Sequence, residues 1–157
     1  MSVNPRFYKG SAMLEKSKEA SAGSLTWQAG QFYRTTDSGI TPVLSDGSQI
    51  SGIYAETQAV ATTAGDKVWV HAITQPDQLF QMSVTSAGTD TKAGSAYVSG
   101  NYGVAVNSCV ATISVGNAST PLFHVYGVVA AKEPFLNDTS DVPGQLICGV
   151  NAAVLTV

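Results

Sequence analysis

From residue 24 onward, apolar and polar residues alternate in short runs, and this period of two is typical of β-strands. Within residues 68–73, for example, Val68, Val70 and Ala72 fall on one face of a strand and the residues between them on the other. Similar runs of β-forming residues cover 31–35, 40–44, 50–54, 79–84, 109–115, 122–130 and 145–157. No segment after residue 24 predicts a helix of ten or more residues. We therefore expect an all-β protein, either a small β-barrel or a β-sandwich.

Turn-forming residues separate these runs. Residues 36–39, 45–48 and the pair Pro76-Asp77 carry the Asp, Gly, Ser and Pro that tight turns favour. Pro42 lacks a backbone donor, which predicts an edge strand or a strand end there. The polar, glycine-rich segment 85–94 allows two interpretations. It is either a seam between an N-terminal β lobe (24–84) and a C-terminal β lobe (85–157), or a surface loop of one continuous domain (24–157).

Residues 1–23 form a different kind of segment, and we expect an extended N-terminal arm. Pro5 disfavours helix around it, and Ser, Lys, Glu and Gly dominate the rest. A short helix across 12–20 is the alternative. The first 34 residues carry five basic and two acidic side chains, whereas the remainder carries three basic and nine acidic ones. Such a basic arm either pairs with an acidic surface, including another copy of the chain, or is a solvated tail.

Composition narrows the class of protein. Only 12% of the 157 residues are charged, about half the usual share, while 17 are Ser and 15 are Thr. The net charge of -3 argues against nucleic acid as a partner. The chain begins without an apolar signal region, and no apolar stretch is long enough for a membrane helix. We therefore expect a soluble protein made in a reducing cytoplasm, with Cys109 and Cys148 as buried free thiols.

The sequence contains no catalytic motif that we can identify. His71 and His124 both fall within predicted strands, which favours half-buried structural histidines over metal ligands. The acidic segment 137–141 resembles a calcium loop but lacks the required Gly and Glu. We expect no catalytic, cofactor-binding or metal-binding residues and no cofactor, so that an enzyme with a scattered site is the least favoured interpretation.

The low charge favours a role in assembly. Burying an ion in a contact costs several kcal/mol unless it is paired, whereas Ser, Thr and small apolar groups lose their water more cheaply. A surface made for contact with other proteins is therefore poor in ions. The aromatic residues leave an alternative open: they either close the core or form a stacking platform for sugars. The residues concerned are Phe7, Tyr8, Trp27, Phe32, Tyr33 and Trp69.

Residues 23–70 resemble the decoration, or cement, proteins of tailed-bacteriophage capsids. The resemblance lies in an ordered series of short segments: 29–34 (AGQFYR), the turn 36–39, the run 40–44 with its proline, Gly52-Ile53, and 64–70 (AGDKVWV). The C-terminal half is similar to uncharacterised virion proteins of podovirus-like phages, through 77–84 (DQLFQMSV) and 121–128 (PLFHVYGV).

The resemblance implies a structural virion protein without enzymatic activity, which binds the outer surface of a phage capsid and stabilises it. Its partners would be the major capsid protein and further copies of itself, usually as a trimer, with no nucleic acid and no membrane. It would be made in the host cytoplasm and located on the capsid exterior. From the composition of the arm we expect capsid or subunit contacts at Asn4, Pro5, Arg6, Phe7, Tyr8, Lys9 and Arg34. The alternative is a β-sandwich that binds carbohydrate, as in a fibre or attachment module of a virion.

Overall fold

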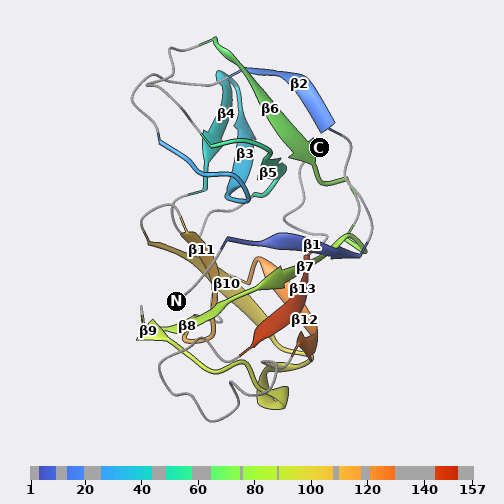
Figure 1. Ribbon diagram of the computed structural model, residues 1–157, viewed down its shortest axis with the longest axis vertical. Coiled ribbons are helices and arrows are strands. Elements are labelled where there is room, and N and C mark those ends of the chain that lie inside the picture. Colours follow the sequence, from blue (N-terminus) through green and yellow to red (C-terminus); the bar gives the residue numbers. More distant parts are fainter. Residues whose placement is uncertain are drawn as a thin grey trace.

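The protein consists of two β-sheets, one packed against the other, as shown in a computed structural model (Figure 1). The structure describes residues 4–9, 14–19, 26–43, 49–57, 65–74, 76–87, 89–107, 110–117, 121–129 and 144–151, with the backbone alone for 14–19. The all-β prediction is confirmed. Within these ranges, no helix has the length and apolar character to cross a membrane.

The smaller sheet has five antiparallel strands. Their order is β2 (Leu14–Glu19), β6 (Lys67–Ala72), β5 (Gly52–Tyr54), β3 (Phe32–Thr36) and β4 (Gly39–Pro42). The sheet is curled, so that its edge strands β2 and β4 approach each other. The predicted turn after β3 is confirmed: the Thr36 hydroxyl donates a hydrogen bond of 2.9 Å to the Gly39 carbonyl. Pro42 ends the edge strand β4, as expected.

The larger sheet has eight strands. Their order is β1 (Arg6–Lys9), β7 (Leu79–Met82), β13 (Gln145–Val150), β12 (Phe123–Val129), β10 (Asn101–Asn107), β11 (Val110–Ser114), β8 (Val84–Ser86) and β9 (Thr89–Asp90). All neighbours are antiparallel except β11 and β8. A single turn of 3-10 helix, η1 (Ser95–Tyr97), precedes β10. The sequence did not predict β10, because its glycine and its two terminal asparagines weaken the β pattern.

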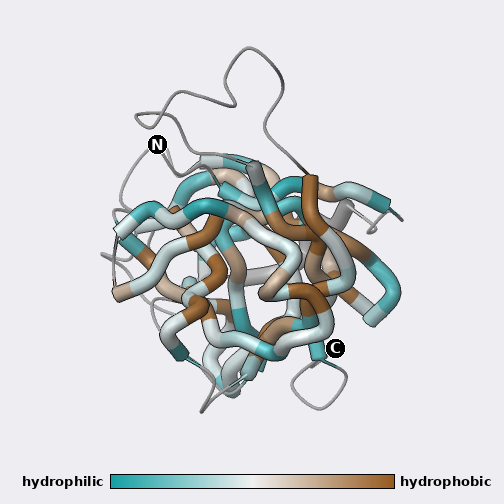
Figure 2. The backbone as a smooth tube through the Cα atoms, turned by 90° about the horizontal axis from the view of Figure 1, so that it is seen from below, coloured by the Kyte–Doolittle hydropathy of each residue, from teal (hydrophilic) through white to brown (hydrophobic). Residues whose placement is uncertain are grey.

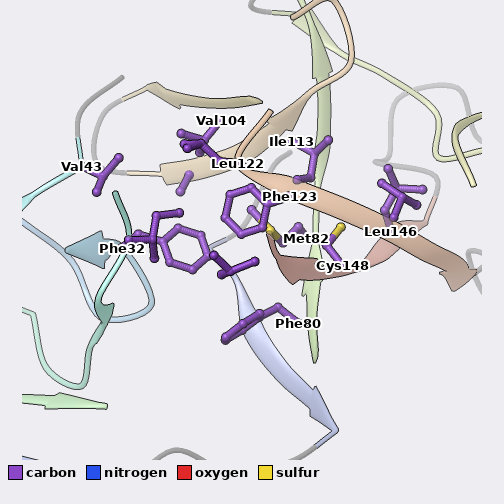
Figure 3. Close-up of a cluster of buried hydrophobic side chains, with 14 of the residues drawn as sticks. Phe32, Val43, Phe80, Met82, Val104, Ile113, Leu122, Phe123, Leu146 and Cys148 are labelled. Carbon is purple, nitrogen blue, oxygen red and sulfur yellow. The ribbon is translucent and has the colours of Figure 1, made fainter. Parts of the chain in front are cut away.

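The main hydrophobic core lies between the two sheets (Figure 3). Phe32 of the smaller sheet contacts Phe80 and Phe123 of the larger one, with ring centroids 5.7 and 5.0 Å apart. Viewed from below, hydrophobic and hydrophilic segments alternate along the strands (Figure 2), as expected for strands that bury one face. The core therefore joins residues from both halves of the chain.

A second buried cluster occupies the other face of the smaller sheet. Phe32 and Tyr33 are adjacent in β3 and point to opposite faces, so Phe32 joins the main core and Tyr33 joins the second cluster. Trp27 closes this cluster by stacking on Tyr54, with ring centroids 4.6 Å apart. The Tyr33 ring crosses directly over Gly52, where an added Cβ would collide with that ring and with the His71 carbonyl. Gly52 thus permits the close packing that the second cluster requires.

The N-terminal segment is extended but not detached from the body. β1 pairs with β7 at one edge of the larger sheet, and β2 pairs with β6 at one edge of the smaller sheet. The alternative of a helix across 12–20 is therefore wrong for β2. Phe7 also contacts His71 of β6, with ring centroids 5.9 Å apart, so β1 touches both sheets. These two N-terminal strands each extend a sheet of the folded body.

The sheets divide the chain at a different point from the predicted seam. β6 belongs to the smaller sheet and β7 to the larger one, so the change of sheet falls between Ala72 and Leu79. β8 and β9, at the start of the segment 85–94, pair with each other inside the larger sheet. The prediction assigned residues up to 84, and hence β7, to the N-terminal lobe. In the structure β7 pairs with β13 and belongs to the larger sheet. This pairing joins distant parts of the chain, so no local sequence signal reveals it.

Candidate functional site

Among the residues that the structure describes, Tyr8 and Tyr126 are the exposed large hydrophobic side chains, and both lie at β-bulges of the larger sheet. The β1–β7 register skips Tyr8, and the β12–β13 register skips Tyr126. A bulge inserts one extra residue in a strand and turns its side chain away from the regular pleat. The bulges therefore present aromatic rings, 50% and 53% exposed, on a sheet whose other large apolar side chains are mostly buried.

The strand registers define one continuous outer face of this sheet. Residues directly opposite each other on neighbouring strands share a face. One row faces the core and consists of the half-buried Phe7 and the buried Phe80, Cys148 and Val125. The two adjacent rows face outward, and they consist of Lys9, Leu79, Gly149, His124 and Asn101, and of Arg6, Gln81, Ile147 and Gly127. We call these two rows, together with Tyr8, Tyr126 and Gln145, the outer face.

The outer face contains two cations, Arg6 and Lys9, and no carboxylate among its residues. Its centre is formed by Leu79 and Ile147, which are half-buried, and by Gly149. Gly149 is covered by the Pro76 carbonyl and the Tyr126 ring: an added Cβ would come within 2.7 Å of the Pro76 oxygen and 3.1 Å of Cε2 of Tyr126. The outer face therefore combines apolar and amide side chains with two positive charges.

Arg6 occupies a defined position at one side of the outer face. Its Nε and Nη2 atoms donate hydrogen bonds of 3.0 and 2.7 Å to Oε1 of Gln81 on β7. Nη2 also donates a longer one, of 3.5 Å, to Oε1 of Gln145 at the start of β13. Side chains from two further strands, β7 and β13, thus hold the guanidinium group of Arg6 in place.

At the other side of the outer face, His124 lies between two neighbours, Asn101 and Tyr126. Nδ1 of His124 lies 2.9 Å from Oδ1 of Asn101 on β10, within hydrogen-bonding distance. The His124 ring packs edge-on against Tyr126, with centroids 4.7 Å apart. An imidazole, an amide and an exposed phenol ring therefore lie together on the surface.

The structure separates the predicted contact residues into two groups. Asn4, Pro5 and Phe7 hold the strand in place: Oδ1 of Asn4 accepts a hydrogen bond of 3.0 Å from the Ala111 amide, Pro5 is buried, and Phe7 packs against Phe80. Arg6, Tyr8 and Lys9 are exposed. This division follows from the pleat of β1 and its bulge.

Arg34 does not lie on the same strand or the same sheet as the other predicted contacts. It is exposed on β3 of the smaller sheet, opposite Thr41 of β4. The structure therefore gives no basis for grouping Arg34 with Arg6 and Lys9. Its role in a contact stays a prediction.

The platform of six aromatic residues considered for sugar binding does not exist as a surface. Trp27, Phe32 and Tyr33 are buried, with at most 3% of their surface exposed. The other interpretation, in which these aromatic rings close the core, is confirmed for these three residues. The sequence did not identify Tyr126, Gln81 or Gln145 as surface residues of interest. Only the Tyr126-Gly127 pair inside an apolar run indicated a bulge.

Titratable groups show little sign of a catalytic arrangement in the part of the chain that the structure describes. No group of three or more His, Cys, Asp or Glu side chains is placed to hold a metal ion there. His71 and His124 lie in different sheets.

Cys148 is a free thiol in the main core, and burial raises its pKa. Burial, together with the neighbouring Tyr33, also raises the pKa of Tyr54. Cys109 and the segment 137–141 lie outside the described residues.

Comparisons with protein-family models, curated proteins and solved structures find no match to this chain. The assignment of a function therefore depends on the residues of the chain and their geometry.

Proposed function

We propose that the protein is a structural component of a phage virion, which binds the outside of the capsid and stabilises it. The observation that carries the proposal is the outer face of the larger sheet, which combines two exposed tyrosines and other apolar residues with amides and two cations, and has no carboxylate among its residues. The resemblance of residues 23–70 to decoration proteins supplies the kind of partner, which is the major capsid protein. No catalytic step is part of this function.

Removing water from a surface costs free energy that depends on the groups in that surface. Charged groups in a contact cost several kcal/mol unless they are paired, so the two cations of the outer face, Arg6 and Lys9, require oppositely charged or hydrogen-bonding partners. Apolar area and amide groups lose water at lower cost and gain packing in return. With only 12% of its residues charged, the chain is suited to extensive contacts with other subunits.

Three edge strands of the two sheets are poorly suited to pairing with a further strand, which favours a capsid contact through the outer face. β1 carries Arg6 and Lys9 and a bulge, β9 has only two residues, and β4 ends in Pro42. Charges, bulges, short length and proline all hinder the pairing of an edge with a further strand. We therefore assign the capsid contact to the outer face and not to these edges.

The capsid would be stabilised because the same contact is repeated by every copy of the protein around it. Each copy makes a modest contact, and a homo-oligomer, a trimer by the resemblance, engages several capsid subunits at once. Linked contacts strengthen binding far beyond each single one, because the second contact forms at a high effective concentration.

The direct test is cosedimentation of the purified protein with expanded phage heads that lack it, together with sedimentation analysis of the free protein. We expect an oligomer that binds the heads. Tyr126→Asp places a carboxylate on the exposed part of the outer face and should weaken binding at least tenfold. Ser38→Asp adds the same charge at an exposed turn of the smaller sheet and serves as the control. A wild-type protein that stays in the supernatant would refute the proposal.

One observation favours a second candidate, a carbohydrate-binding module of a virion. Tyr126 is exposed beside His124 and Asn101, and an aromatic ring flanked by polar groups suits the stacking of a sugar. This function predicts a monomer in solution and binding on a glycan array that Tyr126→Ala abolishes. Binding to heads with no glycan binding would exclude it.

A further inference from the structure

We propose that Arg6, Gln81 and Gln145 form a carboxylate-binding site on the outer face, and that its occupant is an Asp or Glu side chain of the capsid surface. The identity of the partner rests on the proposed function. The chemistry of the site follows from the three side chains alone.

The hydrogen bonds fix the orientation of both glutamine amides. A guanidinium group only donates hydrogen bonds, so each glutamine must turn its oxygen toward Arg6. Two of the three bonds share Oε1 of Gln81, at 3.0 and 2.7 Å, and the third reaches Oε1 of Gln145 at 3.5 Å. As a consequence, the NH₂ groups of Gln81 and Gln145 are turned away from the guanidinium.

The three side chains retain donors for a ligand. Within the described residues, no hydrogen bond engages Nη1 of Arg6 or Nε2 of either glutamine. Arg6 is exposed, while Gln81 and Gln145 are only partly covered. A cation with unused N–H groups is thus flanked by two amides that also present N–H groups, and all of these donors suit an anionic oxygen.

A carboxylate is the ligand that fits best. The two glutamines take the N–H groups of Nε and Nη2, and a carboxylate accepts charge-assisted hydrogen bonds from the two N–H groups of Nη1. Among the residues that the structure describes, the outer face supplies no carboxylate to pair with Arg6. Nucleic acid phosphate is a poorer candidate, because the net charge of -3 opposes binding to a polyanion.

The hydrogen bonds from Arg6 to the two glutamines also reduce the entropy cost of binding a ligand at this site. A free arginine loses much rotamer entropy when it is fixed in a contact. Gln81 and Gln145 already hold Arg6 in position, so less entropy remains to be lost when a partner binds. Lysine at this position could not engage both amide oxygens and a carboxylate in the same planar geometry.

The first experiment measures binding to expanded heads at low and high salt. Arg6→Gln should weaken binding about tenfold or more, and Arg6→Lys should not restore it. Lys92→Gln removes one exposed positive charge beyond β9 and should leave binding within about twofold of wild type. Equal losses for the Arg6 and Lys92 variants, or no loss for either, would overturn the site.

A second variant protects this test against misfolding. Gln81→Glu supplies a carboxylate within the site itself, which should pair with Arg6 and block the partner. We expect it to unfold at the same or a higher temperature than the wild type while binding heads about tenfold less. A stable Gln81→Glu protein that binds heads normally would contradict the proposal.

A measurement without heads separates this inference from the proposed function. Sodium acetate, titrated against sodium chloride at equal ionic strength, should shift the NMR signals of the Arg6 Nε–H and of the Gln81 and Gln145 side-chain amides. If the wild type does not bind heads but acetate shifts these signals, the proposed function fails and the site stands. If acetate and chloride act alike, the site is rejected.

Discussion

At the scale of single residues, burial decides the chemistry of the ionisable groups inside the protein. Cys148 is completely buried between Leu146 and Val150 on β13, and Tyr54 is buried beneath Trp27. Burial penalises the charged form of both side chains and raises the pKa of each. These groups therefore stay neutral in the folded state at pH values where they ionise in the unfolded chain.

This difference predicts a loss of stability at alkaline pH. Below about pH 9, the usual pKa of a thiol, Cys148 is protonated in both states and adds no pH dependence. Above it, only the unfolded state releases the proton, so the free energy of unfolding falls as pH rises. We expect Cys148 to contribute a loss of about 1 kcal/mol between pH 8 and pH 10. Urea unfolding at the two pH values measures it. In Cys148→Ala the decline should be smaller by that amount; an unchanged decline would contradict the assignment.

At the scale of elements, β1 has one side chain packed into the protein and others exposed on the outer face. Phe7 points inward and packs on Phe80, with ring centroids 4.7 Å apart, whereas Arg6 and the bulged Tyr8 point outward. A deletion of residues 2–10 would therefore remove both a packed strand and the exposed contacts. Single substitutions within β1 separate the two effects.

Phe7→Ala should loosen β1 while leaving the rest of the fold intact. Phe7 is half-buried, so we expect a loss of about 2 kcal/mol in the free energy of unfolding. Hydrogen exchange at the amides of β1 and β7 should become faster, with little change in β12. Tyr8→Ala, at the exposed bulge next to it, should cost less than about 1 kcal/mol. Equal effects of the two substitutions would show that the inward packing of Phe7 does not anchor the strand.

At the scale of the whole molecule, one core unites the two sheets. Phe32, Ile53 and Ile73 come from the N-terminal half of the chain, and they belong to the same buried cluster as Phe123 and Leu146 from the C-terminal half. The interface between the sheets is thus the interior of the protein (Figure 3). Two lobes that shared only a small polar contact would unfold separately.

The shared core predicts one cooperative unfolding transition. Phe32→Ala removes the ring that contacts Phe80 and Phe123, and it should lower the free energy of unfolding by about 3–5 kcal/mol. Circular dichroism and the fluorescence of Trp27 should give coincident curves for wild type and variant. Phe32→Leu keeps most of the volume and should cost about 1.5 kcal/mol or less. Two separate transitions, with only one affected by Phe32→Ala, would contradict a common core.

The sequence by itself determined the secondary structure class and much of its local detail. Alternation at Val68 and Val70 placed both on a buried face, and the backbone requirements of Pro42 and of the turn before Gly39 fixed a strand end and a hairpin. These features depend on a few neighbouring residues, so the local sequence contains the information. The charge deficit likewise indicated a surface suited to protein contacts.

Only the tertiary structure decided which strands are neighbours and which side chains meet. The pairing of β7 with β1 and β13 joins residues about 70 positions apart, and it alone brings Gln81 to both Arg6 and Gln145. The bulge at Tyr126 likewise depends on its register with β13. Such contacts follow from long-range packing, which alternation and turn signals do not encode. The arm residues that the sequence suggested as contacts stay a prediction, whereas the outer face and the hydrogen bonds of Arg6 to Gln81 and Gln145 could be found only in the tertiary structure.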